Sequence, residues 1–197
     1  MTIEHAVKKQ TDKKNAILDS ALALFVSQGF HATSTASIAK AAGVATGTLF
    51  HHFPSKDSII NHLFLNIKQE FANTITSNSQ VIGDIELDAN ALWQSAIDWA
   101  IAQPLKQKFF LQFSLSAEIN AATRQQAMNG ILRFIVELIE KGQQQNIVAH
   151  YPIDLLLENC HGQYLAAIRF FTDHPELGKD ASHRHASFQL FWKAIKA

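Results

Sequence analysis

The sequence predicts an all-α protein, on three observations. Glycine and proline are scarce, with 8 and 4 among 197 residues, whereas Ala, Leu, Ile and Phe are common, which favours helices. Apolar residues recur at spacings of three and four, as they do on one face of an amphipathic helix. No alternating run of apolar and polar residues persists, so the sequence predicts no β-strand.

The first two helices are marked by residues that favour helix ends. Behind a polar N-terminal arm, Thr11 or Asp12 is expected to cap a helix that ends at Gly29. Thr35 is expected to cap a short second helix, with Gly43 as its C′ residue. The apolar residues expected to face inward are Ile17, Ala21, Leu22, Phe25, Ile38, Ala39 and Ala42.

The next two helices are separated by a proline. A third short helix is expected from about residue 45 to residue 53, and Pro54 breaks it. Ser55 is expected to cap a fourth, longer helix. The apolar stripe of this fourth helix consists of Ile60, Leu63, Phe64, Ile67 and Phe71. The polar segment 73–88 is the predicted boundary region.

Five further helical segments are expected after this region. Pro104 and Pro152 suit the first turn of a helix. One amphipathic helix is expected to run without a break from Met128 to Ile139. The expected segments are a Trp-rich helix around Trp93, a Phe-rich segment at 109–115, the helix at 128–139, a helix at 152–174 and a last helix at 180–196.

Composition narrows the class of protein. Cys160 is the only cysteine, so no internal disulfide can form, which favours a reducing compartment. The N-terminus has no apolar run behind its charges, and no window approaches the roughly 18 apolar residues of a spanning helix. We expect a cytoplasmic protein without a membrane partner. The formal net charge is zero, but the first 60 residues are mildly basic and the remainder mildly acidic, which suggests two functions.

The second and third helices have the properties of a helix-turn-helix. Gly43 tolerates the positive φ that the turn requires. A recognition helix enters a major groove about 12 Å wide, so its first residues must be small or form hydrogen bonds. Thr46, Gly47 and Thr48 satisfy this demand. Thr35 is placed to bind a phosphate.

The run from Ile17 to Ile60 resembles the DNA-binding domain of TetR/AcrR-type transcriptional regulators. The resemblance lies in the order and spacing of I-L-x-x-A-L-x-L-F, the Gly29 break, T-S-T-x-x-I-A, A-G-V, G-T-L-F-H-H-F and P-S-K-D. It covers about a quarter of the chain. Phe50 stands where the family usually has a tyrosine that donates its hydroxyl to a phosphate. By this resemblance the DNA-facing residues are Thr35, Ser37, Thr46, Gly47, Thr48, Phe50, His51, His52 and Lys56.

The resemblance also implies a homodimer with a C-terminal ligand-binding domain. We expect a DNA-binding domain at 1–55 and a helical ligand-binding and dimerisation domain at 56–197, joined through the shared fourth helix. The last two helices are where the resemblance places the dimer interface. A cavity for a small apolar ligand is expected among Phe64, Ile67, Phe71, Trp93, Ile97, Phe110, Phe113, Met128, Ile131, Leu132, Ile135, His161, Tyr164 and Ile168.

Other classes of function have little support in the sequence. No His, Cys or acidic pair with zinc-type spacing stands out, so no metal and no cofactor are expected. No nucleophile elbow or phosphate-binding Gly-rich loop is present, so no enzyme is expected. The sequence thus predicts a ligand-responsive transcriptional regulator, in the form of a repressor that leaves a palindromic operator when its ligand binds. The alternative is a small-molecule-binding or adaptor protein that keeps this fold without binding DNA.

Overall fold

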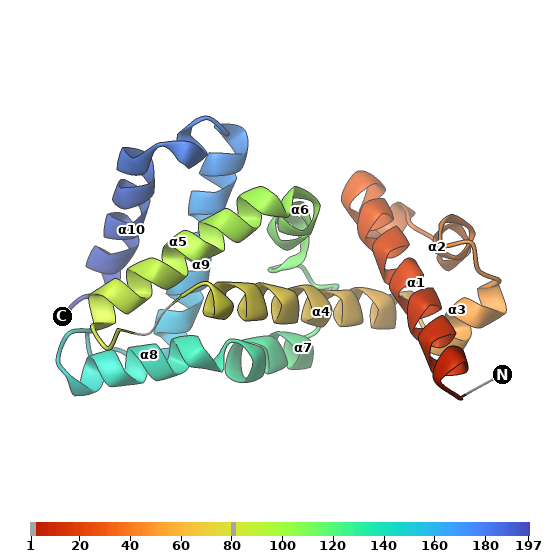
Figure 1. Cartoon of the computed structure of the whole chain (residues 1–197), viewed down its shortest axis with the longest axis horizontal. Coiled ribbons are helices and arrows are strands. Elements are labelled where there is room, and N and C mark those ends of the chain that lie inside the picture. Colours follow the sequence, from red (N-terminus) through yellow and green to blue (C-terminus); the bar gives the residue numbers. More distant parts are fainter. Residues whose placement is uncertain (1–2, 80–81) are drawn as a thin grey trace. The chain divides into compact units, whose positions relative to one another are not determined.

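The computed structural model describes residues 3–79 and 82–197, which form ten α-helices (Figure 1). Within the described residues, β-structure is limited to one isolated bridge between Val148 and Lys196, and the all-α prediction is confirmed. None of the described helices is long and apolar enough to span a membrane. The helices are α1 (Ile3–Ala32), α2 (Thr35–Ala41), α3 (Thr46–His52), α4 (Lys56–Ser77), α5 (Ile85–Ala102), α6 (Pro104–Phe113), α7 (Ala121–Gln126), α8 (Arg133–Gln144), α9 (Ile153–Asp173) and α10 (Ala181–Ile195).

The chain divides into two compact units. The first consists of Met1–Ile67 and Leu105–Thr123, and the second of Lys68–Pro104 and Arg124–Ala197. Helix α4 contributes to both, since its residues up to Ile67 belong to the first unit and its later residues to the second.

The start of the first unit differs from the sequence-based prediction in its helix caps. Helix α1 begins upstream of Thr11 and Asp12, so neither of these residues caps it. Its regular geometry breaks at Gly29, whose φ of 81° and ψ of 166° are not helical. Ser34, and not Thr35, caps α2: the Ser34 hydroxyl accepts a hydrogen bond from the Ser37 amide at 3.0 Å. Ser34 adopts the extended backbone of an N-cap, whereas Thr35 is already helical.

The turn between α2 and α3 follows the prediction. Gly43 has a φ of 65°, a conformation that costs glycine little. The Val44 amide donates a hydrogen bond to the Ala39 carbonyl across the turn, at 3.0 Å. Beneath the turn, Phe25, Ile38 and Leu49 are fully buried. This buried contact fixes α3 against α1 and α2 and leaves the start of α3 exposed.

Helix α4 begins after Pro54 as expected. The Ser55 hydroxyl accepts a hydrogen bond from the Ser58 amide at 3.0 Å, and the Ser58 hydroxyl accepts one from the Ser55 amide at 3.1 Å. This reciprocal pair is a capping box built from two serines.

Two helices of the second unit, α5 and α10, are capped by carboxylates, whereas α2 and α4 are capped by serine hydroxyls. Asp84 accepts a hydrogen bond from the Leu87 amide at 2.9 Å and caps α5. Asp180 accepts one from the His183 amide at 2.9 Å and caps α10, at the position where the last helix was predicted to begin.

The predicted continuous helix at 128–139 is interrupted, and that prediction was wrong. A π-helical turn, Ala127–Ile131, separates α7 from α8. The Leu132 amide donates to the Ala127 carbonyl, five residues back, at 2.9 Å. Such a turn holds one residue more than an α-helical turn, so it rotates the residues on either side relative to each other.

Candidate DNA-reading surface and apolar cavity

The first turn of α3 presents a small polar surface. Thr46 and Gly47 are exposed and Thr48 is half-buried. The preceding residue, Ala45, is the N-cap and makes no side-chain hydrogen bond to the start of the helix. We call Thr46, Gly47, Thr48, Phe50 and His51 the recognition face. The small size of Thr46, Gly47 and Thr48 in the first turn is what an approach to base edges in a major groove requires.

Phe50 lies on this face and not in the core. Its side chain is 46% exposed, whereas its neighbour Leu49 is fully buried. A ring without a hydroxyl cannot donate to a phosphate, but it can pack against a thymine methyl or a sugar. Its position therefore suits an apolar contact with DNA.

His51 and His52 lie beside a basic part of α1. Their ring centroids are 5.5 Å apart. Partial burial, and then the neighbouring His51, Lys14 and Lys13, lower the pKa of His52 below 6.5. His52 is therefore neutral at pH 7. The lysines that affect it contribute positive charge next to α3 although the net charge of the whole chain is zero.

The three remaining predicted DNA contacts already have structural roles or neighbours. The Ser37 hydroxyl takes part in the cap of α2, donating to the Ser34 carbonyl at 2.7 Å. Thr35 is half-buried in the first turn of α2. Lys56 donates from Nζ to the carbonyls of Phe30 at 2.8 Å and Thr33 at 2.9 Å. Their contacts with phosphate stay predictions.

Lys56 therefore binds the carbonyls at the C-terminal end of α1. Its ammonium also lies 4.2 Å from the centroid of the Phe30 ring, which is a cation–π distance. A cation at the end of a helix interacts favourably with the exposed carbonyls there. Two of its three N–H donors are used in this way.

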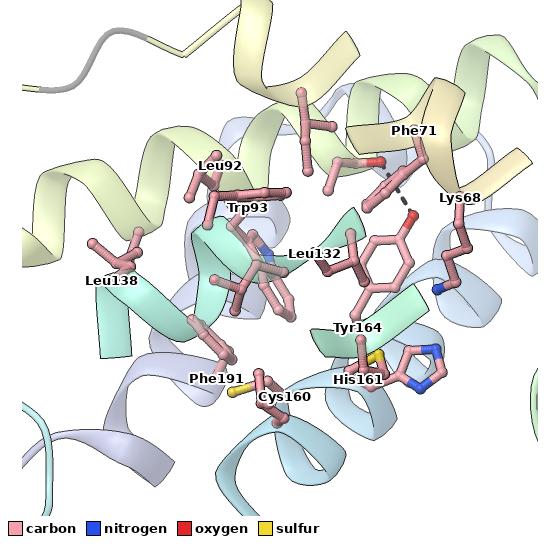
Figure 2. A pocket seen from close by; sticks show the side chains of 17 residues that line it. Lys68, Phe71, Leu92, Trp93, Leu132, Leu138, Cys160, His161, Tyr164 and Phe191 are labelled. Atoms are coloured by element: carbon pink, nitrogen blue, oxygen red, sulfur yellow. Dashed lines mark hydrogen bonds between the residues drawn. The ribbon is translucent and has the colours of Figure 1, made fainter. Parts of the chain in front are cut away.

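The second unit contains an apolar cavity of about 110 Å³ (Figure 2). Seven residues predicted from the sequence line it: Phe71, Trp93, Met128, Leu132, Ile135, His161 and Tyr164. Leu132 and Ile135, which follow the π-helical turn, line the cavity, whereas Ile131, the last residue of the turn, is half-buried and lies outside the lining.

The other residues predicted for the ligand lie outside this cavity. Phe64, Phe110 and Phe113 are buried in the first unit, where the Phe64 and Phe110 rings are 5.9 Å apart. Ile67 and Ile97 are buried core residues. Ile131 is half-buried, and Ile168 lines a separate hollow. Their contacts with a ligand stay predictions.

Sequence reasoning missed ten lining residues: Lys68, Ile75, Ala89, Leu92, Ala96, Phe134, Leu138, Leu157, Cys160 and Phe191. One of them carried a usable signal. Lys68 is four residues after Phe64 and three before Phe71, so it falls on the apolar stripe of α4 where a lysine is unexpected. Most of the others are apolar residues that resemble any core residue in sequence.

Burial governs the protonation of the polar groups in the cavity. It lowers the pKa of Lys68 to about 8. Burial, together with nearby Lys68, lowers the pKa of His161 to about 3. Burial also raises the pKa of the Cys160 thiol to about 11 and that of the Tyr164 hydroxyl above its usual value. At pH 7 the cavity thus contains one cation, Lys68, among neutral groups.

A helix-turn-helix with an exposed polar recognition face, joined by a shared helix to a helical unit with a cavity, defines a DNA-binding transcription regulator. No group of three or more His, Cys, Asp or Glu suited to a metal ion occurs among the described residues. Residues 17–63 match the bacterial regulatory proteins of the tetR family. A tetR family transcription regulator from Shewanella sp. PV-4 has 57% identity and a TM-score of 0.93, over 94% of this chain and 98% of that one. The chain belongs to the tetR family.

Two curated relatives illustrate how the similarity is distributed. The nucleoid occlusion factor SlmA of Haemophilus ducreyi is 24% identical over 96% of this chain and 93% of that protein. The transcriptional repressor KstR2 of Rhodococcus jostii is 39% identical, but over 27% of this chain and 26% of that protein. The similarity over the full length is therefore low, whereas the higher identity is confined to about a quarter of each protein.

Proposed function

We propose that this regulator is a homodimeric repressor that leaves a palindromic operator when a small, largely apolar molecule occupies the cavity. In this proposal residues 1–55 form the DNA-binding domain, and residues 56–197 bind the ligand and form the dimer. The recognition face enters the major groove, and two copies of α3 occupy successive grooves about 34–36 Å apart.

The observation that carries the proposal is the continuity of α4. Ser55 and Ser58 cap its first turn in the first unit, and Lys68, Phe71 and Ile75 on its later turns line the cavity. A ligand that shifts the later turns of α4 therefore acts on an element that also holds the helix-turn-helix. The ligand must bind the DNA-released state more tightly, because only differential affinity moves such an equilibrium.

Helices α9 and α10 support a dimer interface in the second unit. Leu155 and Phe170 on α9 are 63% and 40% exposed, and Leu190 on α10 is 74% exposed. Large apolar side chains exposed together on neighbouring helices favour an interface. A two-fold dimer through these helices would bring α9 and α10 of both copies into one four-helix bundle.

Selection of bound sequences from a random duplex library tests the proposal without knowledge of the natural operator. The purified full-length chain is expected to enrich an inverted repeat, and sedimentation should show one dimer on each duplex. Thr48→Ala should enrich a changed or weaker motif. If nothing is enriched even at low salt, the alternative of a protein that keeps the fold without binding DNA is favoured instead.

A further inference from the structure

One end of the cavity differs chemically from the rest of its lining. Lys68 on α4 and His161 on α9 line it, and among its described lining residues none carries a carboxylate. Figure 2 shows the Lys68 side chain extending toward the His161 ring, at the end of the cavity away from Leu138. The cavity therefore has a basic end and an apolar body.

Burial makes this basic end suited to an anion. Lys68 is only 2% exposed, and transfer of an ammonium group from water to an apolar interior is costly. His161 Nε2 is buried and makes no hydrogen bond within the described part of the chain. A buried polar atom without a hydrogen bond also costs free energy. An oxyanion between the two groups would lower both costs.

The other polar groups of the lining are directed at the protein. The Tyr164 hydroxyl donates to the Ala96 carbonyl at 3.4 Å, and Trp93 Nε1 donates to the Ser187 hydroxyl at 3.1 Å. These groups position the rings and leave the walls of the cavity apolar. The polar part of a ligand is therefore expected at Lys68 and His161, and its apolar part along the walls.

We propose that the cavity binds a small amphipathic carboxylate, with its carboxylate accepting hydrogen bonds from Lys68 and His161 and its apolar body among Trp93, Leu132 and Ile135. The inference rests on the proposed function, because it assigns the chemical class of ligand for the same cavity. Charge-assisted hydrogen bonds of this kind are among the strongest in proteins. A cavity of about 110 Å³ is somewhat smaller than the roughly 150 Å³ that holds a benzene molecule. The ligand body is thus no larger than a short chain or a single ring.

The charge states of the lining give the inference a pH signature. Lys68 has a pKa of about 8, whereas Cys160 and Tyr164 stay protonated and His161 stays neutral between about pH 7 and pH 9. Of these groups, Lys68 alone changes charge in that range. Affinity for a carboxylate should fall as the pH rises through this range, and affinity for a neutral alcohol should not.

Two matched pairs of probes test the inference on the full-length chain without DNA. Hexanoate is compared with 1-hexanol, and benzoate with benzyl alcohol, by calorimetry and thermal shift. Lys68→Met replaces the buried ammonium with an apolar side chain and should fold. Exposed Lys141, outside the cavity lining, supplies the control Lys141→Met. Lys68→Met should weaken hexanoate binding by about tenfold or more and 1-hexanol binding by less than about twofold. The control should bind like the unsubstituted chain.

Three results would overturn the inference. The alcohols could bind as tightly as the carboxylates, Lys68→Met could leave carboxylate binding unchanged, or neither pair of probes could bind. The pH series on the unsubstituted chain keeps the test independent of the folding of Lys68→Met. Since these assays contain no DNA, their failure leaves the proposed repressor function standing, whereas failure of the operator selection leaves the ligand result standing.

Discussion

The recognition face and the cavity lining place opposite demands on the chain. Thr46 and Gly47 are exposed and contribute little to a core, whereas Trp93 and Phe191 in the second unit stack at 4.5 Å and are almost fully buried. A substitution on the recognition face can change DNA binding while leaving the fold intact. A substitution in the cavity lining is expected to change ligand binding and stability together. Experiments on this protein must therefore separate the two effects.

Trp93→Ala should have the largest effect. The ring is 6% exposed, stacks on Phe191 and donates to Ser187. Its loss is expected to destabilise the fold by about 3–5 kcal/mol and to lower Tm by about 10 °C. Response to a ligand should fall more than operator affinity. Thermal unfolding and operator titration measure the two effects.

Phe50→Ala is the matched control, because this aromatic residue is 46% exposed. It should change stability by less than about 0.5 kcal/mol. If the two substitutions destabilised the chain equally, the contrast between the recognition face and the cavity lining would fail.

Lys56→Ala should come next. Its ammonium donates to the Phe30 and Thr33 carbonyls, so its removal is expected to cost about 2 kcal/mol of stability. If Lys56 also contacts a phosphate, as the sequence predicts, the slope of log affinity against log salt should fall by about one unit. If stability falls but the salt slope is unchanged, Lys56 binds only the carbonyls at the end of α1 and does not contact a phosphate. Lys40 is an exposed lysine, so Lys40→Ala is the control for the loss of one positive charge.

Thr48→Ala should have a smaller and more selective effect. The residue is half-buried on the recognition face and its methyl and hydroxyl can meet a base edge. Affinity for the selected operator should fall by about tenfold, with little change on random duplex and in Tm. Ser27→Ala is a suitable control, since the Ser27 hydroxyl is exposed and donates to the Leu24 carbonyl. Equal losses on operator and random DNA would remove Thr48 from the base contacts.

A change of pH should give the smallest effect. The pKa of His52 lies below 6.5 in the folded chain, chiefly through partial burial. Well above pH 6.5 His52 is neutral in both the folded and the unfolded chain. As the pH falls below 6.5, the unfolded chain takes up the proton first, which disfavours folding. DNA phosphates favour the protonated ring, so operator affinity should rise by a few-fold between about pH 7 and pH 5.5. His52→Gln should remove most of that rise.

The first unit was more predictable from sequence than the cavity for a physical reason. Positive φ at Gly43, a break at Gly29 and a capping serine at Ser55 are each requirements of backbone geometry that few residues can satisfy. Even there, the prediction chose Thr35 as the cap of α2, whereas Ser34 is the cap. The two residues are adjacent and both have hydroxyls that can cap a helix, so the sequence does not distinguish them.

The cavity depends on differences that composition does not reveal. Phe64 and Phe71 lie on the same predicted stripe of α4, but one is core of the first unit and the other lines the cavity. The π-helical turn at Ala127–Ile131 changes which residues face inward, and nothing in the local sequence required it. Of the lining residues that the prediction missed, Lys68 carried a signal in the sequence, because it is a lysine on an apolar stripe.

The helix caps of the two units should respond differently to a fall in pH. Ser34 and Ser55 cap with hydroxyls, which keep their hydrogen bonds at any pH at which the chain folds. Asp180 caps α10 with a carboxylate, which loses this capacity on protonation. Hydrogen bonds from His183 and Ser182 lower the pKa of Asp180 from 3.8 to about 2. Its contribution is therefore complete above about pH 4 and is lost as the pH falls through about 2. Acidification should therefore loosen the start of α10, while α2 and α4 keep their serine caps.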